Sequence, residues 1–185
     1  MTASVAKKRF NTSEYRKMAE MGILPERGIE LIEGEIIEMS PIGGKHLSCV
    51  NTLAELLSEQ LGKSVILSIQ NPVQLDVLSE PEPDIAILKR ISSRYADHLP
   101  TAKDTLLLIE VADTSYAYEK EIKLPLYAKS LIPEYWIVRL ETAEIEVFWH
   151  PSGENYLQHQ LFRRGEIAQS QHTSLALPVN EVFFL

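Results

Sequence analysis

Cysteine is almost absent from this sequence of 185 residues, which contains only Cys49. A single thiol cannot form a disulfide within the chain and cannot build a metal site from several thiolates. Long apolar runs are missing as well, because no window approaches the roughly 20 apolar residues that span a bilayer. The basic residues Lys7, Lys8 and Arg9 are not followed by the apolar stretch of a signal peptide. We therefore expect a cytoplasmic protein without a membrane partner.

Basic residues are fewer than acidic ones, with 18 Lys and Arg against 26 Asp and Glu and a formal net charge of -8. Proteins that hold nucleic acid through its backbone are usually basic on at least one face, so this balance weakens a nucleic-acid function. It does not exclude one, because a bound divalent cation supplies positive charge to a carboxylate cluster. The G-x-S-x-G and G-x-x-x-x-G-K motifs of serine hydrolases and phosphate loops are absent.

The length and the 45% hydrophobic content are sufficient for one domain with a core of its own. We expect residues 1–185 to form this domain and residues 1–10 to be a flexible tail. Apolar periodicity and turn residues predict helices over 14–20, 46–61 and 119–130, a hairpin over 29–39, and strands over 65–69, 73–77, 84–88, 106–111, 135–138, 144–149 and 156–162. This order favours an α/β fold of the α+β kind, in which helices flank a central mixed sheet that follows an N-terminal helix and hairpin.

Two acidic residues stand in or beside predicted strands: Asp84 follows the proline-rich turn 79–83, and Glu110 ends the apolar run 106–109. A carboxylate in such a strand is costly to bury unless it is paired, hydrogen-bonded or bound to a cation. Two acids on neighbouring strands can converge on Mg²⁺ or Mn²⁺, which activates water and stabilises charge on a phosphate. Each acid also has a simpler interpretation, because an acid at a strand end often caps a turn or pairs with a lysine.

A lysine is the next requirement for phosphodiester hydrolysis, and the spacing E-x-K fails because Ala112 lies two residues after Glu110. Lys123 is a candidate from the following helix. It lies four residues after Glu119, so the alternative is an exposed ion pair worth less than about 1 kcal/mol. Pro125 indicates that the regular helix begins near Lys123. His46 opens the long helix 46–61, where a hydrogen-bonded structural histidine is the alternative to a functional one.

Several segments also occur together in the order of a known family: 30–36 (ELIEGEI), 39–43 (MSPIG), 79–86 (SEPEPDIA), 95–98 (YADH), 109–115 (IEVADTS), 123–128 (KLPLYA) and 132–138 (IPEYWIV). They resemble the Uma-type restriction endonucleases, a bacterial family of unknown function in the PD-(D/E)XK superfamily. The resemblance extends from about Phe10 to the C-terminus. It implies a restriction-endonuclease-like core with a divalent-metal site.

In this resemblance, Asp84 matches the aspartate of the "PD" motif, Glu110 matches the acidic residue of the next motif, and Lys123 matches the lysine of the following helix. Two positions depart from the family pattern. Glu119 and Arg139 stand where the family usually has aspartate. The first change keeps the charge, whereas the second reverses it at the end of a strand.

The first functional hypothesis is metal-dependent hydrolysis of phosphodiester bonds in DNA. Asp84 and Glu110 would hold Mg²⁺ or Mn²⁺ with the backbone carbonyl of Val111, and Lys123 would orient water or contact the scissile phosphate. His46 and Glu38 are further candidates for completing the site, from the long helix and from the hairpin. The sequence leaves two alternatives open: a nuclease fold kept for binding or assembly, and a nuclease that needs a partner.

A homodimer or higher homo-oligomer is expected, because cleavage of both DNA strands favours two sites related by symmetry. Trp149, Phe183 and Phe184 could form a dimer contact, although packing in the core is the alternative for each of them.

Overall fold

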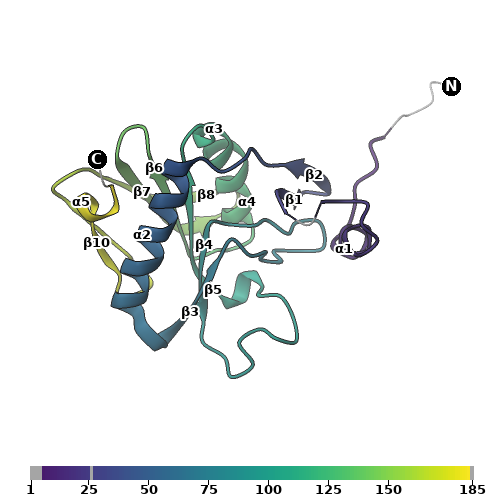
Figure 1. Ribbon diagram of the computed structural model, residues 1–185, viewed down its shortest axis with the longest axis horizontal. Coiled ribbons are helices and arrows are strands. Elements are labelled where there is room, and N and C mark those ends of the chain that lie inside the picture. Colours follow the sequence, from purple (N-terminus) through teal and green to yellow (C-terminus); the bar gives the residue numbers. More distant parts are fainter. Residues whose placement is uncertain (1–5, 26, 184–185) are drawn as a thin grey trace.

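A six-stranded sheet forms the centre of the protein in the computed structural model, which describes residues 6–25 and 27–183 (Figure 1). Across the sheet, its strands are β3 (Val65–Ile69), β4 (Ile85–Lys89), β5 (Thr105–Ala112), β6 (Glu134–Arg139), β7 (Glu144–Ser152) and β8 (Asn155–Phe162). Neighbouring strands are antiparallel except β5 and β6, which are parallel. A parallel pair needs a crossover connection, and here that connection is helical.

The two faces of the sheet are covered by helices from different parts of the chain (Figure 1). On one face, α2 (Gly44–Leu61) packs Val50, Leu53 and Leu57 against β4, β5 and β6. The crossover lies on the other face and consists of α3 (Tyr116–Tyr118), a π-helical turn η3 (Glu119–Lys123) and α4 (Leu124–Lys129). The fold is therefore the mixed sheet with flanking helices that the sequence predicts.

Strand β5 is covered on both sides, which explains its nearly continuous apolar sequence. Successive side chains of a strand point to opposite faces. Ile109 and Val111 accordingly pack in the cluster with α2, whereas Leu108 and Ala112 pack in the cluster with α4. The same alternation places Glu110 on the α4 face.

The N-terminal part lies beside the main sheet and has a small core of its own (Figure 1). Helix α1 (Thr12–Glu20) begins with a capping box between Asn11 and Glu14. Strands β1 (Ile29–Ile32) and β2 (Glu35–Glu38) form the expected hairpin, and Glu33 and Gly34 both have positive φ in its turn. The Glu80 N–H donates to the Leu31 carbonyl at 2.7 Å, which docks the hairpin against the segment before β4.

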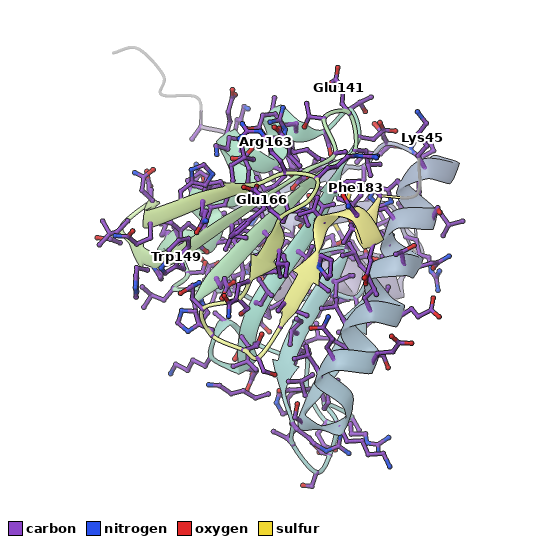
Figure 2. The ribbon with its side chains drawn as sticks, turned by 90° about the vertical axis from the view of Figure 1, so that its left-hand side faces the viewer. Lys45, Glu141, Trp149, Arg163, Glu166 and Phe183 are labelled. Carbon is purple, nitrogen blue, oxygen red and sulfur yellow. The ribbon has the colours of Figure 1, made fainter. Side chains whose placement is uncertain are left out.

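The C-terminal part adds β9 (Ile167–Gln169), β10 (Ala176–Pro178) and α5 (Val179–Val182) next to α2 (Figure 2). Sequence patterns did not predict these short elements. Phe183 is buried in the α2 cluster, and Trp149 is partly buried against the same cluster. Phe184 lies outside the described residues. Within those residues, no helix combines the length and the apolar character needed to cross a membrane.

One predicted strand does not form. Residues 73–77 form no strand beyond an isolated bridge between Gln74 and Thr101. The third long helix begins at Tyr116 rather than at residue 119, and short 3-10 turns η1 (Gly62–Ser64) and η2 (Ala102–Asp104) precede β3 and β5. Residues 1–5 of the expected flexible tail lie outside the described residues. Phe10, at the other end of that tail, contacts the hairpin, because its N–H donates to the Gly34 carbonyl.

Candidate active site

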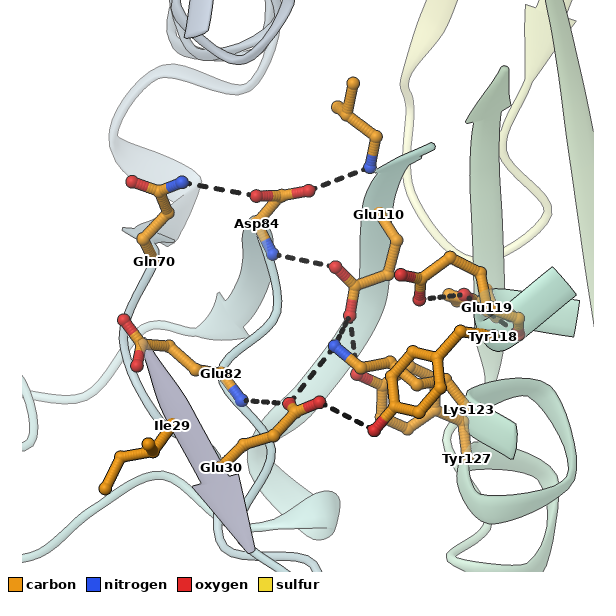
Figure 3. Close-up of polar contacts among 12 residues, drawn as sticks. Ile29, Glu30, Gln70, Glu82, Asp84, Glu110, Tyr118, Glu119, Lys123 and Tyr127 are labelled. Carbon is orange, nitrogen blue, oxygen red and sulfur yellow. Dashed lines mark hydrogen bonds and ion pairs between the residues drawn. The ribbon is translucent and has the colours of Figure 1, made fainter. Parts of the chain in front are cut away.

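Asp84 and Glu110 are joined by reciprocal contacts at the start of β4 and the end of β5 (Figure 3). The Asp84 N–H donates to Glu110 Oε2 at 3.1 Å, and the Val111 N–H donates to Asp84 Oδ2 at 2.9 Å. Gln70 Nε2 donates to the other Asp84 oxygen at 3.3 Å. The two acids on which the sequence argument rests therefore lie side by side.

The end of the β4–β5 ladder explains why these side chains reach backbone groups. The ladder begins at the pair Ile85–Ile109, so the N–H of Val111 has no backbone partner on β4 and donates to Asp84 Oδ2 instead. The N–H and C=O of one strand residue point to the same edge of the strand. The Val111 carbonyl therefore faces the side on which Asp84 lies.

Glu110 and Lys123 form a buried ion pair. Glu110 is 3% exposed and Lys123 is 2% exposed. Lys123 Nζ lies 2.9 Å from Glu110 Oε1, and the Tyr127 hydroxyl donates to the same oxygen at 2.7 Å. The regular helix α4 begins directly after Lys123, as Pro125 predicted. The alternative, in which Lys123 forms an exposed ion pair with Glu119, is wrong.

Glu30 is part of this cluster, and sequence reasoning missed it. It comes from β1, is fully buried and lies 3.2 Å from Lys123 Nζ through its Oε2. The Tyr118 hydroxyl donates to Glu30 Oε1 at 2.9 Å, and the Glu82 N–H donates to Oε2 at 3.2 Å. The sequence does carry a signal for Glu30, because this acid is flanked by Ile29 and two further aliphatic residues. An apolar flank of the same kind indicated Glu110.

The cluster contains more buried carboxylates than cations. Burial raises the pKa of Glu110 well above its usual value, and the charges of Glu119 and Asp84 act in the same direction while Lys123 opposes them. Burial likewise raises the pKa of Glu119. Burial disfavours the charged form of Lys123, but Glu110, Glu30 and Glu119 outweigh it and raise the lysine pKa well above its usual value. Lys123 is therefore an ammonium that faces several buried carboxyl groups.

His46 lies against Asp84, whereas Glu38 does not join the cluster. His46 Nε2 is 2.9 Å from Asp84 Oδ2, and its Nδ1 is buried without a partner among the described residues. Burial disfavours the imidazolium, but the hydrogen bond and charge of Asp84 outweigh it and raise the His46 pKa. Glu38 is exposed at the end of β2. Of these two further candidates from the sequence, His46 therefore lies next to Asp84, and Glu38 does not.

The oxygen donors suit a hard cation, although they do not form a ready cage. Among the described residues, no group of three His, Cys, Asp or Glu side chains is spaced to hold a metal ion. Mg²⁺ is usually held by one or two carboxylates and keeps several waters, so Asp84, Glu110 and the Val111 carbonyl supply a sufficient set. The excess of buried carboxyl groups over cations also fits a cation. The residues present therefore fit Mg²⁺ or Mn²⁺ by chemistry and charge.

A hollow of about 510 Å³ is lined by residues of α1, by Gln70 and its neighbours, and by Glu80 and Glu82. Its lining includes Gln70, which contacts Asp84, and Glu82, whose N–H contacts Glu30. Arg16 and Arg27 also line it. The hollow therefore borders one residue that contacts Asp84 and one that contacts Glu30.

A mixed central sheet, two acids at adjacent strand ends and a lysine from the next helix define a restriction-endonuclease-like protein. The chain belongs to the Uma2 family, described as "Putative restriction endonuclease", whose family model matches residues 12–180. This family is the one that the sequence segments resemble. No curated protein matches the chain.

One solved structure supports the same fold. A crystal structure described as a "putative nuclease belonging to DUF820" from Anabaena variabilis ATCC 29413 is similar to the chain with a TM-score of 0.72 and 15% identity, covering 94% of this chain and 97% of that chain. The type IIG restriction endonuclease BpuSI has a TM-score of 0.41 and 17% identity, and the match covers 74% of this chain and 14% of that chain. The first similarity shows the fold, and the second is too weak to carry an argument.

Proposed function

We propose that this protein is an endonuclease that depends on a divalent metal and hydrolyses phosphodiester bonds in DNA. The observation that carries the proposal is the interlocked pair of Asp84 and Glu110 with the buried Lys123 beside it. Membership of a family described as restriction endonucleases supports DNA as the substrate. Mg²⁺ or Mn²⁺ is the proposed cofactor.

The proposed roles follow from the contacts of each side chain. Asp84, Glu110 and the Val111 carbonyl would hold the cation, which when bound supplies a Lewis acid and lowers the pKa of water. Lys123 keeps an ammonium next to Glu110 and would stabilise negative charge on the phosphate. The His46 ring fixes the orientation of Asp84 through its Nε2 contact.

The electrostatics of the cluster support a cation at this position. Glu30, Glu110 and Glu119 are all buried near one lysine. Buried charges without compensation are costly, so the surplus of carboxylates disfavours the folded protein when no cation is present. Such a cost is more common at functional sites than elsewhere in a protein.

An inactive or partner-dependent nuclease fold is the second candidate, and a specific observation favours it. Both oxygens of Glu110 are occupied, Oε1 by Lys123 and Tyr127 and Oε2 by the Asp84 N–H. A cation that is to bind Oε1 must displace Lys123 or Tyr127, because that oxygen already accepts two donors. A partner that rearranges the cluster would then be needed for activity.

Calorimetric titration of Mn²⁺ and Mg²⁺ into the wild type and Asp84→Ala, with plasmid nicking measured on the same samples, tests the proposal. Asp97→Ala is the matched control, because Asp97 is an exposed acid of a surface loop. Saturable binding and nicking that are lost only in Asp84→Ala would support the enzyme. Binding without nicking would favour the second candidate, and equal nicking by Asp84→Ala and the wild type would contradict the assignment.

Oligomerisation belongs to the same proposal. Two symmetry-related sites would let a homodimer cut both strands of a duplex. Sedimentation velocity with and without a short DNA duplex measures the oligomeric state directly. A dimer is expected to convert supercoiled plasmid to linear rather than nicked product. A monomer that only nicks would contradict this part of the proposal.

A further inference from the structure

Lys123 has two carboxylate partners that come from different parts of the fold (Figure 3). Its Nζ lies 2.9 Å from Glu110 Oε1 on β5 and 3.2 Å from Glu30 Oε2 on the N-terminal hairpin. The exposed fractions of the side chains of Lys123, Glu110 and Glu30 are 2%, 4% and 0%. The ammonium is thus shared between a proposed metal ligand and a residue of the hairpin.

A cation that binds Glu110 has to compete with this ammonium. The Tyr127 hydroxyl and the Asp84 N–H are neutral donors, whereas Lys123 carries a full positive charge on Glu110 Oε1. Like charges in a buried site repel strongly because solvent screens them little. Lys123 is therefore the donor whose contact with Glu110 weakens most when a cation arrives.

Glu30 provides a second counter-ion for Lys123. A buried ammonium without a partner is strongly destabilising. Glu30 already lies within ion-pair distance of Lys123, so the lysine keeps a counter-ion without a change of backbone. The Tyr118 hydroxyl and the Glu82 N–H hold the Glu30 carboxylate, so its orientation does not depend on Lys123.

We propose that Glu30 is a positioning residue that holds Lys123 in the site when a divalent cation takes over Glu110. The inference rests on the proposed function, because it requires Glu110 to be a metal ligand. It gives the N-terminal hairpin a role in the reaction: β1 supplies the carboxylate that lets one lysine and one cation occupy neighbouring positions.

Glu30→Gln tests this role while keeping the shape and one acceptor oxygen of the side chain. Without the Glu30 charge, Lys123 pairs with Glu110 alone and competes more strongly with the cation. We expect the affinity for Mn²⁺ to fall by about 10-fold or more, within the usual range of coupling between sites. A protein that carries Lys123→Met has no competing ammonium. In that protein we expect Glu30→Gln to alter the affinity for Mn²⁺ by less than about 3-fold.

The experiment is a double-mutant cycle of Mn²⁺ affinity by calorimetry on the wild type, Glu30→Gln, Lys123→Met and the double variant. Glu35→Gln is the control, because Glu35 is an exposed acid on the same hairpin whose only ion pair among the described residues is with Lys7 at the surface. A loss that depends on Lys123 supports the inference. Equal losses in both backgrounds would mean that Glu30 acts as a distant negative charge, and no loss in either would remove its role; both results overturn the inference.

A wild type that binds no Mn²⁺ would overturn the proposed function itself, which separates that failure from a failure confined to Glu30. Circular dichroism confirms folding of each variant. If Glu30→Gln does not fold, Tyr118→Phe takes its place, because it removes only the hydroxyl that orients Glu30. We expect a smaller loss of Mn²⁺ affinity that again disappears with Lys123→Met, and a loss that persists there would contradict the inference.

Discussion

Two buried glutamates on adjacent parallel strands, Glu110 of β5 and Glu134 of β6, show two ways of keeping a carboxylate in a protein core. Glu134 is fully buried and accepts from neutral donors: the Trp136 ring N–H, the Ser170 hydroxyl at 2.9 Å and the backbone N–H groups of residues 171 and 172 at 2.9 and 3.0 Å. These contacts fix the C-terminal segment to the sheet. Glu110 instead shares one ammonium with other acids.

The comparison teaches that burial of an acid is not by itself a sign of function. Neutral donors aimed at a carboxylate stabilise its charge fully, and such a residue holds structure together. Acids that compete for one cation leave negative charge uncompensated, and this arrangement suits the binding of a further cation. We therefore expect changes at the two glutamates to act on different properties, Glu134 on stability and Glu110 on metal binding.

The largest effect on stability is expected from Lys123→Met, which removes the ammonium from the Glu110 cluster. Breaking a buried pair leaves charge without compensation and costs about 3–5 kcal/mol. Urea unfolding measures the loss, with Lys129→Met as the control, because within the described part of the chain Lys129 forms only an exposed pair with Glu33. Equal stability of Lys123→Met and the wild type would contradict the buried ion pair.

Glu134→Ala is expected to destabilise the protein by about 3 kcal/mol, because several buried donors lose their acceptor. Metal binding should be unchanged, since Glu134 belongs to another cluster. Urea unfolding and Mn²⁺ calorimetry on the same variant check both statements. A variant with normal stability and weakened metal binding would reverse the assignment of the two glutamates.

Glu110→Gln should abolish Mn²⁺ binding and yet leave stability equal or higher by about 1 kcal/mol at pH 8. The pKa of Glu110 is raised in the folded protein, so the native state binds more protons than the unfolded state above the usual glutamate range. Its burial therefore destabilises the wild type increasingly as pH rises from about 4.5 through the raised value. The stability gained by Glu110→Gln should be larger at pH 8 than at pH 5, and an opposite trend in urea unfolding would contradict the raised pKa.

The smallest effect is expected from Tyr127→Phe, which removes one neutral donor from Glu110 Oε1. The loss of a hydrogen bond to a charged group costs about 1.5–3 kcal/mol, but here Glu110 keeps the Lys123 contact and we expect about 1 kcal/mol. Mn²⁺ affinity should rise, because one competitor for the carboxylate is gone. Calorimetry measures this sign, and a clear fall in affinity would mean that Tyr127 orients Glu110 for the cation.

Periodicity predicted the central elements of the fold because each has a full apolar face, as in α2 and β5. It failed at residues 73–77, where Val73 and Leu75 donate to the carbonyls of Pro81 and Ser79 rather than to a regular partner strand. Alternation of side chains shows that a backbone is extended, but it does not show whether a neighbouring strand is available. The short strands β9 and β10 carry too few residues for any period to appear.

For the site, the sequence identified Asp84 and Glu110 from their position beside apolar strands, and the resemblance identified Lys123. Glu30 could not be placed by these arguments, because its contact with Lys123 depends on how the hairpin docks against the segment before β4. That docking is a contact between residues far apart in the chain, and no local pattern encodes it.

The π-helical turn before α4 has a consequence for how the site is put together. Its hydrogen bonds span five residues rather than four, as the Leu124 N–H bonded to the Glu119 carbonyl illustrates. Tyr118 and Lys123, five positions apart, both reach Glu30. In a regular α-helix, side chains five positions apart diverge by about 140°. Rewinding this turn as a regular α-helix with the same residues would swing the tyrosine away from the lysine, so the wider π-helical turn is what aligns both side chains on Glu30.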